Sequence, residues 1–306
     1  MEPAIVSTNR GKRFRIGRWL LGMLLAAAAL LAAYMWWVVA RFDTKTLPAR
    51  HGQVDVELFV RDGGKRPLLV GLGGSEGGNP WASDRWRGQR ERFLDQGYAL
   101  LALGYFGTPN SPEALDRISL DGVHAAITEA ARDPRVDGRC IALIGGSRGA
   151  ELALLLASHY PDIDAVVAIV PGSAVFPALT DAMTTPGFSR GDKPLPFVPM
   201  TWSATPDLLV GNLRGAFETI MQDEAAMARA AIPVERINGP VQFVSASRDE
   251  AWPSKEMSDA MMQRLKARGF RHHAEHLLVQ GGHAEPLDEF PKMEAFLETR
   301  FKQACR

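Results

Sequence analysis

Residues 141–154 read IALIGGSRGAELAL, and they carry a strong signal for the fold. An apolar run typical of a buried strand ends in two glycines, and a helical pattern begins at Arg148. Between them lies Gly145-x-Ser147-x-Gly149, a strand–turn–helix motif that exposes a serine hydroxyl at the end of a sheet. The glycines are needed because larger side chains would collide with the strand and the helix beside this tight turn. The segment therefore predicts an α/β protein with Ser147 as a nucleophile.

The rest of residues 54–306 repeats this alternation of apolar runs and helical stretches. Strands are predicted over residues 54–60, 67–72, 98–103, 140–144, 163–170, 241–245 and 276–279. Helices are predicted over residues 83–96, 121–131, 148–160, 217–231 and 254–268. Apolar strands separated by helices indicate a mostly parallel sheet with helices on both faces.

One stretch, residues 171–206, interrupts the alternation. It contains seven prolines, a density that resists both helix and strand. Because it follows a predicted strand, it starts at the carboxyl edge of the sheet, where α/β folds bind ligands. We expect it to form a lid over Ser147, and the alternative is a plain surface insertion.

A serine nucleophile needs a base, and the base needs an acid that orients it. On sheets of this kind the chain order is serine, then acid, then histidine. His283 lies in a loop after the last predicted strand, and Asp249 lies in a loop after residues 241–245. Glu250 is the nearest competitor of Asp249. Each residue alone would be read as a solvated loop side chain, but the order and the positions together predict a triad of Ser147, Asp249 and His283.

Such a triad also needs backbone N–H groups that hold an oxyanion. One is expected from Arg148, which follows the nucleophile. The other is expected from the glycine-rich stretch at residues 71–78, with Leu72 as first choice and Gly73 as second.

Two other kinds of site are disfavoured by the sequence. The glycine-rich stretch lacks the Gly-Lys-Ser/Thr ending of a phosphate-binding loop. On a strand, His273 and Glu275 would face away from His272 and His276, so these four side chains would not converge on a metal. We therefore expect no cofactor and no metal.

The first forty residues differ from the rest of the chain. Residues 19–40 carry no charge, and as a helix they would span roughly 33 Å, enough for a bilayer core of about 30 Å. Residues 1–18 carry five basic side chains and one acidic one. The positive-inside rule then predicts a cytoplasmic flank (1–18), a transmembrane anchor (19–40), a linker (41–53) and an extracytoplasmic domain (54–306), periplasmic in a bacterium. A cleaved signal peptide is the alternative, although the apolar run is longer than such peptides usually have.

Composition excludes further classes of protein. The 306 residues include 35 basic and 35 acidic side chains, 46% are hydrophobic and 23% are charged, which is ordinary for a globular chain and unlike a disordered one. The zero net charge hides a division, since the part after residue 18 has a net charge of −4. A nucleic-acid partner is not expected. The two cysteines, Cys140 and Cys305, are too few for a disulfide framework or a zinc site.

Several segments resemble a known family, the C-terminal domain of acyl-CoA thioester hydrolases and bile acid-CoA:amino acid N-acyltransferases. The similar segments are GSRGAELAL at 146–154, GGSEGG at 73–78, LALGYFG at 101–107, DEAWPS at 249–254 and GHAEP at 282–286. The resemblance covers about residues 66–303 and implies an α/β-hydrolase fold with Ser147, Asp249 and His283 as the triad. Three points set this chain apart from the family. The transferase members carry a cysteine nucleophile where this chain has Ser147, and residues 41–65 are too few for the β-sandwich domain of the long members. The domain is also predicted to lie outside the cytoplasm, where coenzyme A should be scarce.

Together these observations predict a membrane-anchored serine hydrolase of acyl thioesters or carboxylic esters. The small-molecule acyl substrate would be cleaved through an acyl-enzyme, with water as the usual acceptor. The alternatives are acyl transfer to an amine or alcohol, and a non-catalytic binding protein that keeps the fold.

Overall fold

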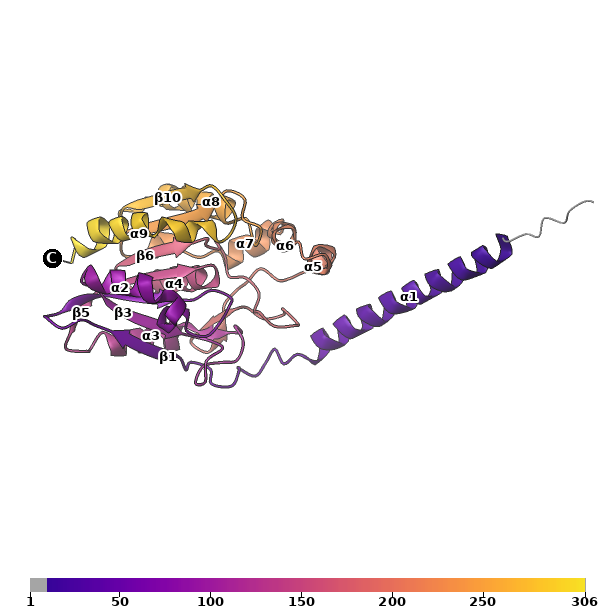
Figure 1. Cartoon of the computed structure of the whole chain (residues 1–306), viewed down its shortest axis with the longest axis horizontal. Coiled ribbons are helices and arrows are strands. Elements are labelled where there is room, and N and C mark those ends of the chain that lie inside the picture. Colours follow the sequence, from indigo (N-terminus) through magenta and orange to yellow (C-terminus); the bar gives the residue numbers. More distant parts are fainter. Residues whose placement is uncertain (1–9, 306) are drawn as a thin grey trace, which may run out of the picture. The chain divides into compact units, whose positions relative to one another are not determined.

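The computed structural model describes residues 10–305, and the chain divides into two compact units, Met1–Asp43 and Thr44–Arg306. The described part of the first unit is dominated by helix α1 (Arg10–Arg41) (Figure 1). Within it, Gly17–Arg41 has a mean hydropathy of 2.0 and is long and apolar enough to cross a membrane, criteria that an N-terminal signal sequence also meets. Of the predicted cytoplasmic flank, residues 1–9 lie outside the described residues.

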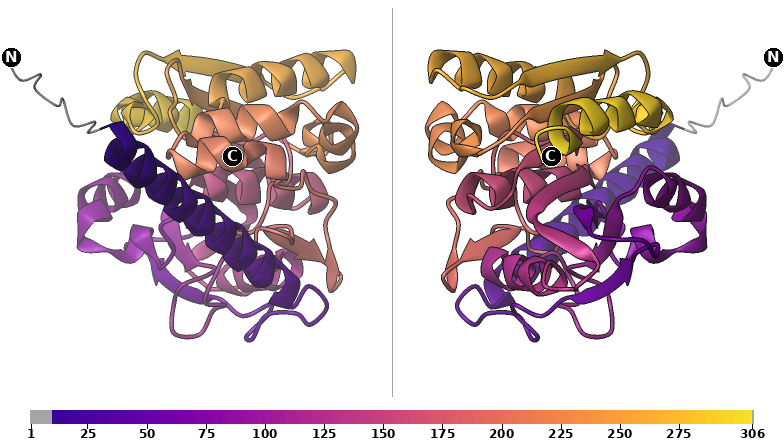
Figure 2. Two further views of the ribbon diagram at one scale, coloured as in Figure 1. Left: turned by 90° about the vertical axis from the view of Figure 1, so that its right-hand side faces the viewer. Right: turned by 90° about the vertical axis from the view of Figure 1, so that its left-hand side faces the viewer.

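The second unit is built on a seven-stranded sheet in the order β1-β3-β2-β5-β6-β9-β10. β1 is antiparallel to β3, and the other neighbouring pairs are parallel. The strands are β1 (Asp55–Phe59), β2 (Arg66–Leu72), β3 (Ala99–Gly104), β5 (Val136–Gly146), β6 (Ala165–Ile169), β9 (Val241–Ala246) and β10 (Ala274–Val279). In Figure 2 the early strands, in purple, lie at the opposite side of the unit from β10, in gold. The predicted mostly parallel sheet is therefore confirmed.

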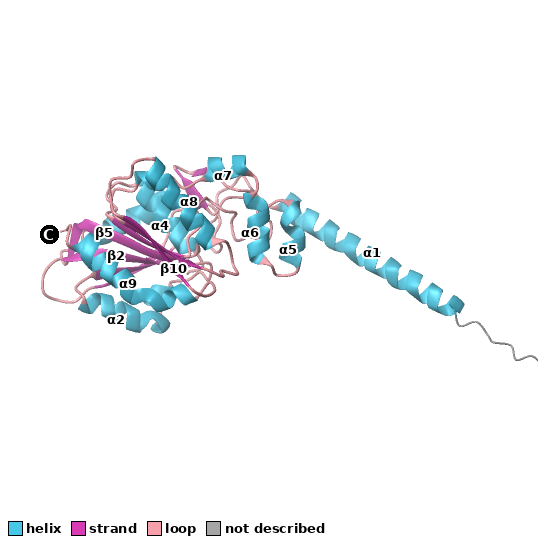
Figure 3. Cartoon of the chain, turned by 90° about the horizontal axis from the view of Figure 1, so that it is seen from above, coloured by secondary structure: helices cyan, strands magenta, loops and turns pink. Residues whose placement is uncertain are grey.

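Helices cover both faces of the sheet, as predicted, because successive side chains of each strand point to opposite faces. Leu68, Val70 and Leu72 of β2 pack in one core cluster, whereas Leu69 packs in the other. The first face is covered by α3 (Leu120–Ala130), α4 (Arg148–His159) and α8 (Ser254–Ala267). The second is covered by α2 (Arg87–Asp95) and α9 (Phe290–Phe296), which lie across the sheet from α4 and α8 in Figure 3.

A smaller substructure stands at the carboxyl edge of the sheet, and all of its elements except β4 follow β6 in the chain. A three-stranded sheet joins β4 (Ile118–Ser119), β7 (Phe188–Arg190) and β8 (Lys193–Pro194). Three short helices follow, α5 (Thr205–Leu209), α6 (Leu213–Met221) and α7 (Glu224–Ala230). The single helix predicted over 217–231 is thus two, because the chain breaks at Gln222–Asp223 and Asp223 caps α7 by accepting from the Ala226 N–H. These helices have a core of their own around Phe176, Ala216 and Trp252.

Short helical turns complete the unit. They are η1 (Pro80–Ala82), η2 (Asp84–Trp86), η3 (Trp202–Ala204), η4 (Val234–Arg236), η5 (Glu285–Glu289) and the π-helical turn η6 (Leu297–Lys302).

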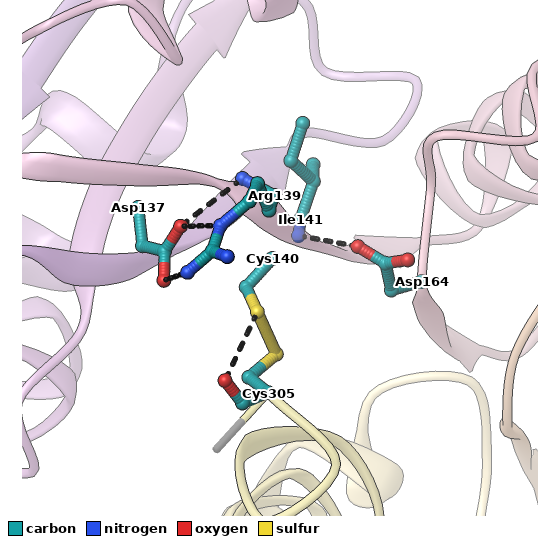
Figure 4. Close-up of a disulfide and its surroundings, with 6 residues drawn as sticks. All are labelled: Asp137, Arg139, Cys140, Ile141, Asp164 and Cys305. Atoms are coloured by element: carbon teal, nitrogen blue, oxygen red, sulfur yellow. Dashed lines mark hydrogen bonds and ion pairs between the residues drawn. A yellow bond between two sulfur atoms is a disulfide. The ribbon is translucent and has the colours of Figure 1, made fainter.

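The two cysteines form a disulfide, which the sequence alone does not indicate. Cys140 lies in β5 and Cys305 follows η6, and their α-carbons are 5.8 Å apart (Figure 4). The bond closes a segment of 165 residues and fastens the C-terminal end of the chain to a central strand.

Candidate active site

Ser147 stands at the sharp turn between β5 and α4. Its backbone has φ +52° and ψ −117°, a strained conformation for a residue other than glycine. The backbone comes so close here that a β-carbon at Gly145 would lie 2.3 Å from the Gly149 carbonyl oxygen, and one at Gly149 would lie 2.2 Å from that of Gly73. The two motif glycines are therefore required sterically. The Ser147 N–H donates to the Ile169 carbonyl at 2.8 Å, which fixes the turn against β6.

His283 and Asp249 are brought together from the loops after β10 and β9. The His283 Nδ1 lies 2.7 Å from Asp249 Oδ1, and the Asp249 side chain is fully buried. The same Oδ1 accepts the backbone N–H groups of Ala251 (3.0 Å) and Trp252 (3.3 Å). Burial alone would raise the pKa of Asp249, but hydrogen bonds from His283 and Ser254 outweigh burial and lower the pKa below its ordinary value. Asp249 is thus placed to remain an anion that holds the imidazole.

Glu250, the competing acid, has a different position. Its Oε2 accepts the backbone N–H of His283 at 2.9 Å, not an imidazole N–H. The side chain is exposed, whereas that of Asp249 is buried. Glu250 therefore braces the loop that carries His283, while the imidazole itself faces Asp249.

Ser147 and His283 line the same cavity, which has a volume of about 210 Å³. The other lining residues are Leu72, Gly73, Gly74, Ser75, Glu76, Pro80, Trp81, Trp86, Gly146, Ile169, Val170, Ala284, Leu287 and Phe290. The wall is mainly apolar and aromatic and suits a hydrocarbon chain. Within residues 10–305, the Ser147 hydroxyl makes no hydrogen bond to His283. Catalytic hydrogen bonds are often long or poorly aligned when no substrate is bound.

Glu76 is the one carboxylate among the described residues that line this cavity. A methyl group at Gly74 would lie 2.7 Å from Glu76 Oε2 and 3.4 Å from the Ser147 β-carbon, so the carboxylate and the nucleophile are neighbours across Gly74. No Lys or Arg occurs in the described lining. The site therefore offers an acyl group an apolar wall but offers an anionic substrate no cation inside the cavity.

The predicted oxyanion donors lie in two different settings. Arg148 is the first residue of α4, so its N–H has no acceptor within the helix. Leu72, in contrast, is not in a loop, because β2 continues through it and pairs it with Leu103 and Gly145. The loop begins at Gly73, whose carbonyl accepts from the Tyr105 hydroxyl at 2.7 Å. The predicted end of the strand at Leu72 is thus confirmed, and the second choice, Gly73, is the first residue after the strand.

The proline-rich segment does not form a wall of the cavity. None of residues 171–206, all of which are described, is among the lining residues. The carbonyls of Phe176 (3.4 Å) and Pro177 (3.1 Å) instead accept from the buried Arg148 guanidinium. The cavity lining thus gives no support to the predicted lid. The Arg148 side chain instead holds the start of this segment in the protein interior.

Arg148 forms a buried ion pair with Glu151, one turn further along α4, at 2.7 Å. Glu151 also accepts the Phe176 N–H at 3.1 Å. Burial raises the pKa of Glu151 to about 7, although Arg148 and the Phe176 N–H both act to lower it. The pair thus joins the first turn of α4, directly behind the nucleophile, to the chain that leaves β6.

Two features of the site escape sequence reasoning. Val170, which lines the cavity, has φ +44°, a rare conformation for a β-branched residue. It is held by a bond from its N–H to the Val244 carbonyl (2.6 Å) and one from the Trp252 indole to its own carbonyl (3.0 Å). Trp252 also lies 6.4 Å from the His283 ring, measured between ring centroids. In the sequence, Trp252 stood out only through its place in residues 249–254, the segment that carries Asp249.

Comparison with known proteins shows which family and which relatives this chain is similar to. The family described as "BAAT / Acyl-CoA thioester hydrolase C terminal" matches residues 119–305, which include Ser147, Asp249 and His283. The chain is 27% identical over 226 residues to acyl-coenzyme A thioesterase 6 of Mus musculus, covering 74% of this chain and 50% of that protein. It is 27% identical over 235 residues to acyl-coenzyme A amino acid N-acyltransferase 2 of Rattus norvegicus, covering 72% and 49%. The chain thus spans about half the length of the curated relatives that it matches.

Solved structures share the fold at low sequence identity. An acylaminoacyl peptidase of Pyrococcus horikoshii has a TM-score of 0.58 at 14% identity, covering 85% of this chain and 41% of that chain. A Pyrococcus furiosus esterase has a TM-score of 0.55 at 16% identity, covering 81% and 88%. These similarities confirm the α/β-hydrolase fold.

Proposed function

Because this chain belongs to the BAAT / acyl-CoA thioester hydrolase C-terminal family, we propose that it is a membrane-anchored serine hydrolase of acyl thioesters or carboxylic esters. One observation carries the proposal. The strained Ser147 and the Asp249-bound His283 line one apolar cavity at the carboxyl edge of the sheet.

The proposed reaction follows from the two ring nitrogens of His283. Since Nδ1 faces Asp249, Nε2 is left to take the proton of the Ser147 hydroxyl as that oxygen attacks the acyl carbonyl. The proton then passes to the departing thiolate or alkoxide, and the acyl group stays on Ser147. Water, deprotonated by His283, releases the acid and restores the serine.

The negative oxygen of the tetrahedral intermediate needs donors beside Ser147. We assign the Arg148 N–H to this role, with the start of α4 adding its favourable dipole. The second donor would come from Leu72 or Gly73, and the end of β2 at Leu72 favours Gly73.

The proposed location outside the cytoplasm has two supports. Gly17–Arg41 can span a bilayer by length and composition. The Cys140–Cys305 disulfide is typical of oxidising compartments and rare in the cytosol. Coenzyme A should be scarce in such a place, so carboxylic esters are as suitable as acyl-CoA.

Acyl transfer to an amine or alcohol is the second candidate. It is favoured by the rat relative, which is named an amino acid N-acyltransferase. Mass spectrometry of the products, with hydroxylamine or glycine competing against water, separates transfer from hydrolysis. Hydrolysis is the expected result.

The nucleophile is tested with a fluorophosphonate probe on the full chain. The wild type should be labelled, Ser147→Ala should not, and Ser75→Ala, a second serine of the cavity, should be labelled as the wild type is. Labelling that persists in Ser147→Ala would remove Ser147 from the mechanism.

A further inference from the structure

We propose that the apolar tip formed by η3, α5 and the start of α6 docks on the lipid bilayer that holds the chain's own anchor. The tip exposes four large apolar side chains: Trp202 (59%), Leu209 (60%), Val210 (78%) and Leu213 (47%). They lie within twelve residues of sequence, on elements that pack together. Such a group on a surface marks an interaction site. This inference rests on the proposed anchor.

The tip carries little charge, as insertion into a bilayer surface requires. Residues 201–214 contain one acidic and one basic side chain, Asp207 and Arg214. Both are partly buried and bonded within the protein. Asp207 accepts from Asn212 at 2.7 Å, and Arg214 pairs with Glu218 at 2.7 Å and with Glu256 at 3.0 Å. A tryptophan beside aliphatic residues is also the combination that favours a membrane interface.

The tether from the anchor joins the domain at the same sheet edge as the tip. β1 runs antiparallel, so its first residue, Asp55, pairs with Gly104 at the carboxyl end of β3. Asp55 also accepts from Asn110, in the loop that follows that strand. The thirteen residues 42–54 can extend roughly 45 Å at most. A short tether that enters the domain at the carboxyl edge keeps that edge near the membrane of the anchor. We therefore take the bilayer as the partner of the tip.

The tip also contacts the catalytic loop. Arg214 of α6 donates to the backbone carbonyl of Asp249 at 3.0 Å. Phe217 of α6 packs on Trp252 at 5.4 Å, and Trp252 in turn packs near His283. Docking would therefore hold the loop of the proposed acid at the membrane surface, where acyl lipids would meet the cavity.

The docking itself is tested by fluorescence of the full chain reconstituted in phospholipid vesicles. The difference between the tryptophan emission of the wild type and that of Trp202→Phe gives the signal of Trp202. Lipids brominated near the headgroup should reduce that signal by about twofold relative to unbrominated lipids. A Trp202 signal that bromine leaves unchanged would overturn the proposal, including the case in which a second copy of the chain covers the tip.

Activity gives a second, independent test. In the same vesicles, Leu209→Ser/Val210→Ser should cut turnover of a long-chain ester embedded in the bilayer by about fivefold, because less apolar surface is available to dock. Turnover of a short soluble ester should stay within about twofold of the wild type, which also shows that the variant folds. The matched control is Leu179→Ser/Leu278→Thr, two exposed apolar residues outside the tip, which should alter neither activity.

The two proposals fail in different ways. Equal loss on both esters, or no loss on either, would contradict docking by the tip. If the wild type cleaves neither ester while bromine still quenches Trp202, the hydrolase proposal fails and docking stands. If quenching is absent while the soluble ester is cleaved, docking alone fails.

Discussion

His283 contacts two carboxylates, the buried Asp249 and the exposed Glu250, and they act on different atoms. Asp249 contacts the ring at Nδ1, whereas Glu250 accepts the backbone N–H. Asp249→Asn should therefore lower kcat by about 10³–10⁴-fold, because an amide no longer holds the required tautomer or stabilises the imidazolium. Glu250→Gln is the matched control and should lower kcat by no more than about tenfold. Equal losses in the two variants would contradict the assignment.

The lowered pKa of Asp249 also predicts how stability depends on pH. A carboxyl whose pKa lies below its ordinary value of 3.8 in the folded state stabilises the fold above that pH. This contribution is lost as the pH falls through the lowered pKa. The difference in melting temperature between the wild type and Asp249→Asn should thus be largest above pH 5 and should shrink toward pH 3. A constant difference across this range, measured by thermal unfolding, would contradict the shift.

At the scale of elements, the Arg148–Glu151 pair connects α4 to the segment after β6. Glu151→Ala leaves a buried guanidinium without its carboxylate and should cost about 3–5 kcal/mol of unfolding free energy. Glu151→Gln keeps the shape and one acceptor for the Phe176 N–H, so its cost should be smaller. Urea unfolding measures both, and a loss below 1 kcal/mol in Glu151→Ala would show that the pair does not hold these elements together.

At the scale of the whole molecule, the disulfide joins the C-terminal end to the middle of the sheet. Its reduction should lower the unfolding free energy by about 2–5 kcal/mol, since it closes a long segment of chain. Thermal unfolding with and without reductant measures this effect. Cys140→Ser/Cys305→Ser is the control and should match the reduced wild type in either condition. An equal response of both proteins to reductant would contradict a stabilising bond.

Much of the fold could be predicted, because the hydrophobic periodicity of each segment agrees with the helix or strand that the segment forms. The predicted strand over 67–72 became Arg66–Leu72, and the helix predicted over 254–268 became Ser254–Ala267. Glycine spacing between an apolar run and a helical pattern indicated the turn at Ser147, where the strand and the helix approach closely. The start of β5 at Val136 was missed, because its pairing with Arg66 and Pro67 of β2 depends on residues distant in sequence. The break between α6 and α7 was missed although Asp223, which caps α7, is a residue type that favours helix starts.

Sequence patterns were enough to predict the sheet, the turn at Ser147 and the chain order of Ser147, Asp249 and His283, since periodicity and turn chemistry are local properties. Tertiary structure alone decided that Asp249 rather than Glu250 faces the imidazole, because adjacent loop residues differ only in what surrounds them. It also decided that Cys140 and Cys305 meet, and that residues 171–206 stay outside the cavity lining while Phe176 and Pro177 within them bind Arg148. These outcomes join parts of the chain far apart in sequence, and only the packed core fixes which of them come into contact.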